Sequence, residues 1–131
     1  MAVERELRKY MPGDMVRMEL TIEHDAMNLE NAFARFINES DPQFHLVLCK
    51  EFLGITREET DGHAQSRVSV EAAVLAGLPT GEYVLEQIHV RCSSGRIYRF
   101  TEDMLPNPRA RFVVAEEPTG TMLLKDTIFM D

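Results

Sequence analysis

The chain has 131 residues, of which 44% are hydrophobic and 27% are charged. This length and balance fit one globular domain with its own core and argue against a disordered chain. The 22 acidic and 14 basic side chains leave a formal charge of −8, whereas nucleic acids and anionic membranes select basic surfaces. We therefore expect a single domain over residues 1–131, with neither nucleic acid nor membrane as a partner.

The N-terminal segment lacks the apolar centre of a secretory signal, and no apolar run is long enough to span a bilayer. The sequence therefore predicts a cytoplasmic protein, or an extracellular one if the chain is the mature part of a longer precursor. Residues 1–12 are expected to form an N-terminal arm, helical or extended. Val3, Leu7 and Tyr10 stand at helical spacing, and Pro12-Gly13-Asp14 ends the segment.

The two cysteines, Cys49 and Cys92, lack the close spacing of a metal site. In a cytoplasmic protein we expect both to be buried, reduced thiols. A disulfide between two strands is the alternative, and it would indicate an oxidising compartment.

Apolar and polar side chains alternate from Met15 to His24, which is typical of a half-buried strand. Similar segments recur between turn signals, and almost no helical period follows residue 11. The pattern predicts an all-β fold, an antiparallel β-sandwich of seven to eight strands, with a barrel of similar strand number as the alternative. The expected strands cover residues 15–24, 32–37, 44–49, 67–75, 83–90, 97–100, 112–115 and 122–129.

The clearest element is a β-hairpin over residues 78–100, with Ser93-Ser94-Gly95 as its turn. Tyr83 and Ile88 fall in opposite phases of the two-residue repeat. A bulge near Glu86-Gln87 reconciles the two phases, as does a strand buried on both faces.

The longest connection runs from residue 50 to residue 66 and includes an acidic run. Long loops are often functional, so this loop and the one at 101–110 are the expected contact surfaces. Thr56-Arg57-Glu58-Glu59 resembles a capping box, which predicts a helical turn inside the longer loop.

The segment Pro79-Thr80-Gly81-Glu82-Tyr83-Val84-Leu85, followed by a strand, Gly95 and a returning strand, resembles bacterial immunoglobulin-like and fibronectin-III-like sandwich domains. Those domains often carry a Gly-x-Tyr at the start of the sixth strand, with the tyrosine hydrogen-bonded to backbone a few residues away. The resemblance covers residues 12–115 and implies a structural corner at Tyr83 and Gly81. It also implies a binding or spacer role without catalytic residues. The absence of Trp and the positions of the two cysteines depart from antibody-type domains.

Two histidines are the first candidates for ligand binding. His45 and His89 each alternate with apolar neighbours, so they share a face if the third and sixth strands are neighbours. Two imidazoles on adjacent strands can hold a ligand or a metal. Two solvated sheet histidines are the simpler interpretation, because no third ligand is fixed nearby. We therefore expect no metal and no other cofactor.

The chain contains no serine-nucleophile elbow, zinc-protease motif, phosphate loop or dinucleotide fingerprint. His45 and Cys49 are about 13 Å apart along an extended strand, too far for a nucleophilic pair. We therefore predict a non-enzymatic module that binds another protein or packs beside a neighbouring domain.

A carbohydrate- or small-ligand-binding sandwich is the alternative, because such modules present aromatic platforms. Phe52 and Tyr98 are the candidate platforms, and together with His45 and His89 they make up the predicted ligand-binding set. The absence of Trp counts against this alternative.

The terminal run from Met122 to Met130 is apolar and is a candidate edge strand. An apolar edge strand invites pairing with another copy of the chain. The sequence therefore predicts a homodimer.

Overall fold

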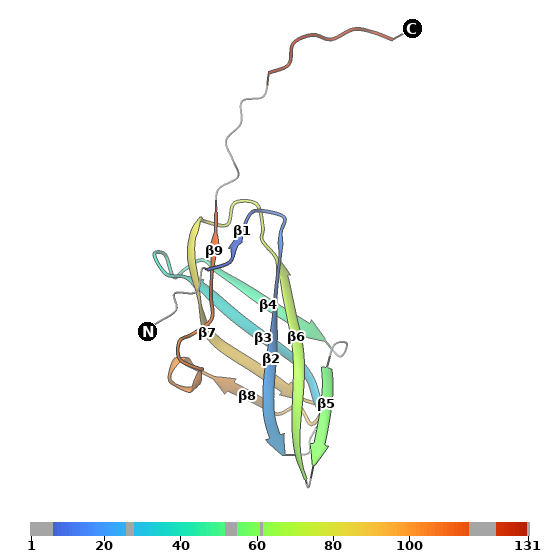
Figure 1. The fold of residues 1–131 in the computed structure, drawn as a ribbon, viewed down its shortest axis with the longest axis vertical. Coiled ribbons are helices and arrows are strands. Elements are labelled where there is room, and N and C mark those ends of the chain that lie inside the picture. The colour runs from blue at the N-terminus through green and yellow to red at the C-terminus, as the bar shows by residue number, and fades with distance from the viewer. Residues whose placement is uncertain (1–6, 26–27, 52–54, 61, 116–122, 131) are drawn as a thin grey trace.

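The computed structural model describes residues 7–25, 28–51, 55–60, 62–115 and 123–130 (Figure 1). Within these residues the regular structure is β-sheet apart from one turn of 3-10 helix, η1 (Glu102–Met104). The strands are β1 (Lys9–Tyr10), β2 (Met15–Asp25), β3 (Leu29–Asn38), β4 (His45–Glu51), β5 (Ile55–Thr60), β6 (His63–Ala73), β7 (Gly81–Cys92), β8 (Ile97–Phe100) and β9 (Arg111–Val114).

The strands form one sheet in the order β1-β9-β7-β3-β4-β6-β2, with β5 paired to β6 and β8 paired to β7. The sheet is mixed, because β1 and β9 are parallel while the other pairs are antiparallel. It curls until it is nearly barrel-shaped (Figure 1). The all-β class is therefore confirmed, whereas an antiparallel immunoglobulin-like sandwich is not.

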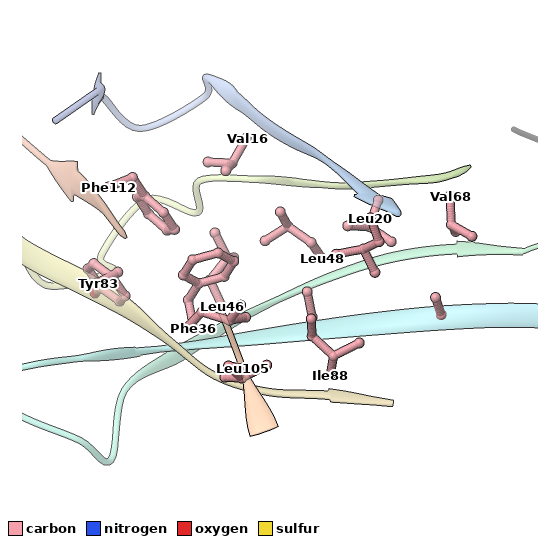
Figure 2. Packing of buried hydrophobic residues seen from close by; sticks show 14 of the residues in the cluster. Val16, Leu20, Phe36, Leu46, Leu48, Val68, Tyr83, Ile88, Leu105 and Phe112 are labelled. Atoms are coloured by element: carbon pink, nitrogen blue, oxygen red, sulfur yellow. The ribbon is translucent and has the colours of Figure 1, made fainter. Parts of the chain in front are cut away.

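Side-chain alternation determines which face of each strand is buried. On β2, Val16 and Leu20 are buried while their neighbours are exposed, and β6 buries Val68 and Val70 in the same way. In Figure 2 the side chain of Leu20 lies beside that of Leu48 of β4, and side chains of β3 and β7 belong to the same core cluster. Each fully buried aliphatic side chain stabilises the fold by about 1.5–3 kcal/mol.

Every strand expected between residues 15 and 115 is present. Of the two explanations for the change of phase in the long hairpin strand, the bulge is the one observed. Arg35 of β3 pairs with Gln87 of β7, but Phe36 pairs with Leu85. Glu86 is therefore the extra residue that moves the buried set of β7 from one phase to the other.

Tyr83 lies at the start of β7 and is fully buried. Its hydroxyl donates a 2.7 Å hydrogen bond to the carbonyl of Pro79, four residues upstream, which is the contact that the resemblance implies. The ring stacks on Phe112 of β9, with 5.4 Å between centroids and 4° between planes. Gly81 has a φ of 129°, and a Cβ there would lie 3.4 Å from Nδ2 of Asn38. This corner therefore requires a glycine.

The N-terminal arm is extended rather than helical in its described part. Lys9 and Tyr10 form β1, which pairs with β9, and the ring of Tyr10 packs edge-on against Phe112 at 5.6 Å. Residues 3–6, which the predicted helical turn also included, lie outside the described residues. A helix of this length is marginal, whereas the edge of β9 supplies backbone partners.

The predicted loop over residues 50–66 with a helical turn at Thr56 is wrong. Residues Ile55–Thr60 form β5, and they pair with β6 from Val68 to His63. The acidic run offers a helix no apolar face to bury, but the edge of β6 satisfies its backbone groups.

The strand expected at residues 122–129 is absent from the described part of that segment, since residues 123–130 have no regular structure. Met122 lies outside the described residues. β9 is the strand that precedes this segment in sequence, and it has no open edge because it pairs with β7 on one side and β1 on the other. Among the described residues, no helix has the length and apolar character needed to cross a membrane.

Replacing Tyr83 with Phe keeps the stacked ring and leaves the Pro79 carbonyl without its donor. We expect Tyr83→Phe to lower the free energy of unfolding by about 1–3 kcal/mol in urea denaturation. Tyr98→Phe is the control, because Tyr98 is only partly buried, and it should change stability little.

The pH dependence of stability tests the same residue. Burial raises the pKa of Tyr83 above its ordinary value of about 10, so the folded state holds the phenolic proton more tightly than the unfolded state. This contribution to stability is constant below pH 10 and is lost as the pH rises above it. If Tyr83→Phe lost as much stability above pH 10 as the wild type does, the loss would not come from Tyr83 and this prediction would be wrong.

Candidate functional site

The curled sheet does not close between β2 and β8. In the part of the chain that the structure describes, β2 pairs only with β6, and β8 pairs only with β7. Both strands therefore present an edge of backbone groups to the gap between them. The gap runs along the side of the molecule where β8 lies near β2 (Figure 1).

Two adjoining hollows occupy this gap. One has a volume of about 400 Å³ and the other about 490 Å³. Ile22, Glu23 and Phe100 line both, so the two hollows form one feature, which we call the seam cleft. Its main apolar lining consists of Met18, Ile22, Ile88, Val90, Tyr98, Phe100, Met104 and Leu105.

The chain after β8 explains why the seam stays open. Tyr98 and Phe100 point inward on a strand of only four residues, and the chain then leaves the sheet through η1. Leu105 inserts into the core at 8% exposure, while Met104 beside it is 57% exposed. The segment that follows η1 is held against β7 at Arg109, whose Nη1 donates a 3.1 Å hydrogen bond to the carbonyl of Leu85.

One end of the cleft is polar. His24 Nδ1 lies 2.6 Å from the carbonyl oxygen of Asp25, and His24 Nε2 lies 2.8 Å from Ser66 Oγ. A carbonyl oxygen only accepts, so Nδ1 donates to it, and in the neutral imidazole Nε2 accepts from the Ser66 hydroxyl. Ser66 is 0% exposed, so this pair joins β2 to β6 and its hydroxyl is closed to a substrate. His63 lies 3.7 Å from the Asp25 carboxylate at the rim.

The structure does not bring His45 and His89 together. His45 is on β4 and His89 is on β7, and β3 lies between these two strands. On β3, Ile37 pairs with His45 and Phe33 pairs with His89. Both histidines are on the outer face, but two strand spacings and four residues separate them by more than about 15 Å.

His89 borders a separate hollow of about 250 Å³ on the outer face. His89 Nε2 and Arg35 Nε are buried there, and neither has a hydrogen-bond partner among the described residues. Arg35 Nε lies 3.9 Å from the carboxylate of Glu86, the bulge residue. This hollow is smaller than the usual range for ligand pockets, about 300–1,000 Å³.

Of the predicted ligand-binding residues, Tyr98 is the one that lies in the seam cleft. The guanidinium of Arg96 lies 5.1 Å from the centre of its ring, so one side of the ring is already occupied. Phe52 lies outside the described residues.

Cleft residues such as Ile22, Phe100 and Met104 are absent from the predicted set. Alternation along β2 and β8 indicates that side chains point inward. It carries no signal for which strands become the two edges of the sheet, because that depends on pairings far along the chain.

The described residues contain no group of three or more His, Cys, Asp or Glu side chains arranged to hold a metal ion. Cys49 is exposed on β4 and Cys92 is buried on β7, and these two described cysteines form no disulfide with each other. The prediction of two buried thiols is therefore wrong for Cys49, which faces outward from β4.

No protein-family model matches the chain, and no curated protein matches its sequence.

The chain has no tryptophan, so a single introduced Trp reports on the cleft without background. In Phe100→Trp the indole faces the cleft, while in Ile97→Trp it lies on the other face of the same strand, where Ile97 is 51% exposed. We expect emission at a shorter wavelength and weaker acrylamide quenching for Phe100→Trp. Equal spectra for the two variants would mean that the cleft is not formed.

Proposed function

We propose that this protein is a non-enzymatic binding module whose seam cleft takes an extended, apolar segment of a protein partner. The observation that supports the proposal is the pairing of two contiguous apolar hollows with two open strand edges. A segment that adds to a strand edge gains affinity from backbone hydrogen bonds and specificity from pockets for alternate side chains.

β2 has the properties of an acceptor strand. It runs for eleven residues without a break, and Met18 and Ile22 are only half-buried on its inner face. Alternate side chains of an added strand point the same way, so every second side chain of the segment enters the cleft. The backbone of the segment meanwhile pairs with the edge of β2.

Charge restricts the partner further. Glu19, Glu23 and Asp25 lie along the cleft, and the whole chain carries a formal charge of −8. A segment with a basic residue among its apolar ones is therefore favoured over an acidic segment. Such attraction raises the association rate and weakens as salt is added.

An immunoglobulin-like sandwich is part of this proposal, and the strand neighbours support it. In that fold strands B, E and D are neighbours in one layer, and C, F and G in the other. Here β2, β6 and β5 are neighbours, as are β3, β7 and β9, while the backbone pairing of β4 with β6 among the described residues is limited to Cys49 and Glu71. Strand A pairs beside B in the family, but β1 pairs with β9 instead. The seam cleft is then the place that strand A leaves empty.

A small apolar ligand is the second candidate, because the volumes of both hollows fall within the range of ligand pockets. A carbohydrate has less support, since Arg96 lies over the ring of Tyr98. The outer-face residues His45 and His89 are too far apart to act as one ligand site with Tyr98.

Selection of twelve-residue peptides from a random phage-displayed library tests the proposal with the full chain as bait. We expect selected peptides to carry apolar residues at alternate positions. They should bind Met104→Asp about ten-fold more weakly than the wild type, because a carboxylate then borders the second hollow. Leu75→Asp is the matched control, since Leu75 is 64% exposed and lies outside the cleft.

Peptides that bind the wild type and Met104→Asp equally would contradict the proposal. If no peptide is selected while dodecanoate binds the wild type more tightly than Met104→Asp, the small-ligand candidate replaces it.

A further inference from the structure

The C-terminal segment carries apolar side chains that the described structure leaves uncovered. Leu123, Leu124, Ile128, Phe129 and Met130 are between 78% and 96% exposed. Single exposed apolar residues are normal, but five within eight consecutive residues indicate an interaction surface. We call residues 123–130 the tail.

The tail has no place beside the strand that precedes it, because β9 is paired on both sides. In the structure of the single chain it does not occupy the seam cleft either, since none of its residues lines either hollow. One molecule therefore presents an uncovered apolar segment and an unfilled apolar cleft with open strand edges.

The lengths of the two elements match. Eight extended residues span about 26 Å, and the eleven residues of β2 span about 36 Å. Six residues of the tail, 125–130, fit along the edge of β2 up to Asp25, where that strand ends, and residues 123–124 then extend past it. The tail contains no proline or glycine, so nothing in it prevents an added strand.

One antiparallel register matches the chemistry of both elements. With Ile128 opposite Ile22, Met130 lies opposite Leu20, and both apolar side chains enter the cleft. The same register places Asp126 opposite His24, at the polar end of the cleft where His63 also lies.

One outward-facing charge of the tail is also matched in this register. Lys125 lies opposite Asp25, which makes an opposite-charge pair across the two strands. A shift by one residue would turn Lys125 toward the core and move Ile128 out of the cleft.

We propose that the tail of one copy adds antiparallel to β2 in the seam cleft of a second copy, with Ile128 opposite Ile22. This inference rests on the proposed function, because it names the partner of the same cleft. Reciprocal exchange fills both clefts and gives a closed two-fold dimer. It also gives the expected homodimer a physical basis.

Sedimentation equilibrium of the full chain tests the inference. We expect wild type and Leu75→Asp to dimerise, and Ile128→Asp and Met104→Asp to dissociate about ten-fold more readily or further. A wild type that stays monomeric at all concentrations, or a dimer that Ile128→Asp leaves unchanged, would overturn the inference.

Disulfide trapping tests the register in chains whose exposed Cys49 is replaced by Ser. In the proposed register Thr21 lies opposite Phe129, so the variant T21C/F129C should oxidise to a covalent dimer. The variant R17C/F129C places its cysteines four residues out of register and should form far less covalent dimer. Equal trapping in both, or a bond within one chain that shows the tail in its own cleft, would overturn the inference.

A synthetic peptide of residues 122–131 separates failure of this inference from failure of the proposed function. The full-length Ile128→Asp protein should bind it, with NMR shifts at Ile22 and Phe100. If this protein does not bind the peptide but still binds library-selected peptides through Met104, the tail is not the partner and the proposed function stands. If the Ile128→Asp protein binds neither the tail peptide nor the selected peptides, both this inference and the proposed function fail.

Discussion

The pairing of β1 with β9 is the contact on which the rest of this structure depends. Tyr10 packs edge-on against Phe112, and Phe112 in turn stacks on Tyr83. These aromatic contacts hold the N-terminal arm on β9, at the opposite end of the strand order from β2. A strand needs a neighbour for its backbone groups on each side, and the position of β1 leaves one side of β2 open. The seam cleft therefore depends on where β1 pairs as well as on how early β8 ends.

Much of the fold could be predicted from the sequence because strands that bury one face show that face in their residue order. The bulge at Glu86 is an instance, since the change of phase between Tyr83 and Ile88 requires one extra residue. β5 could not be predicted in this way. Its residues are almost all polar, and it is a strand only because β6 offers an edge. The tail is the opposite case. Its apolar residues suit a strand, but β9, the strand before it, is paired on both sides and offers it no free edge.

The candidate site was less predictable, because it is made by what the sheet leaves unpaired. Tyr98 was expected from its residue type alone. Ile22 and Phe100 look in sequence like ordinary core residues, and only the strand order shows that no strand covers them. The contact between His24 and Ser66 depends on the register of β2 with β6, which sets residues 42 positions apart side by side. The separation of His45 from His89 also follows from strand order, because β3 lies between their strands.

An open edge beside an apolar cleft is a hazard as well as the proposed binding site, since any apolar strand can add to it. The outer face of β2 limits this hazard through the charges of Arg17, Glu19 and Glu23, which stay exposed along the strand. A segment that pairs with β2 must place its own outward side chains directly opposite these groups, where like charges repel. In the proposed complex, apolar side chains on one face supply the affinity, and charges on the other select the segment and its register. As proposed, a strand edge that carries both favours one partner over indiscriminate aggregation.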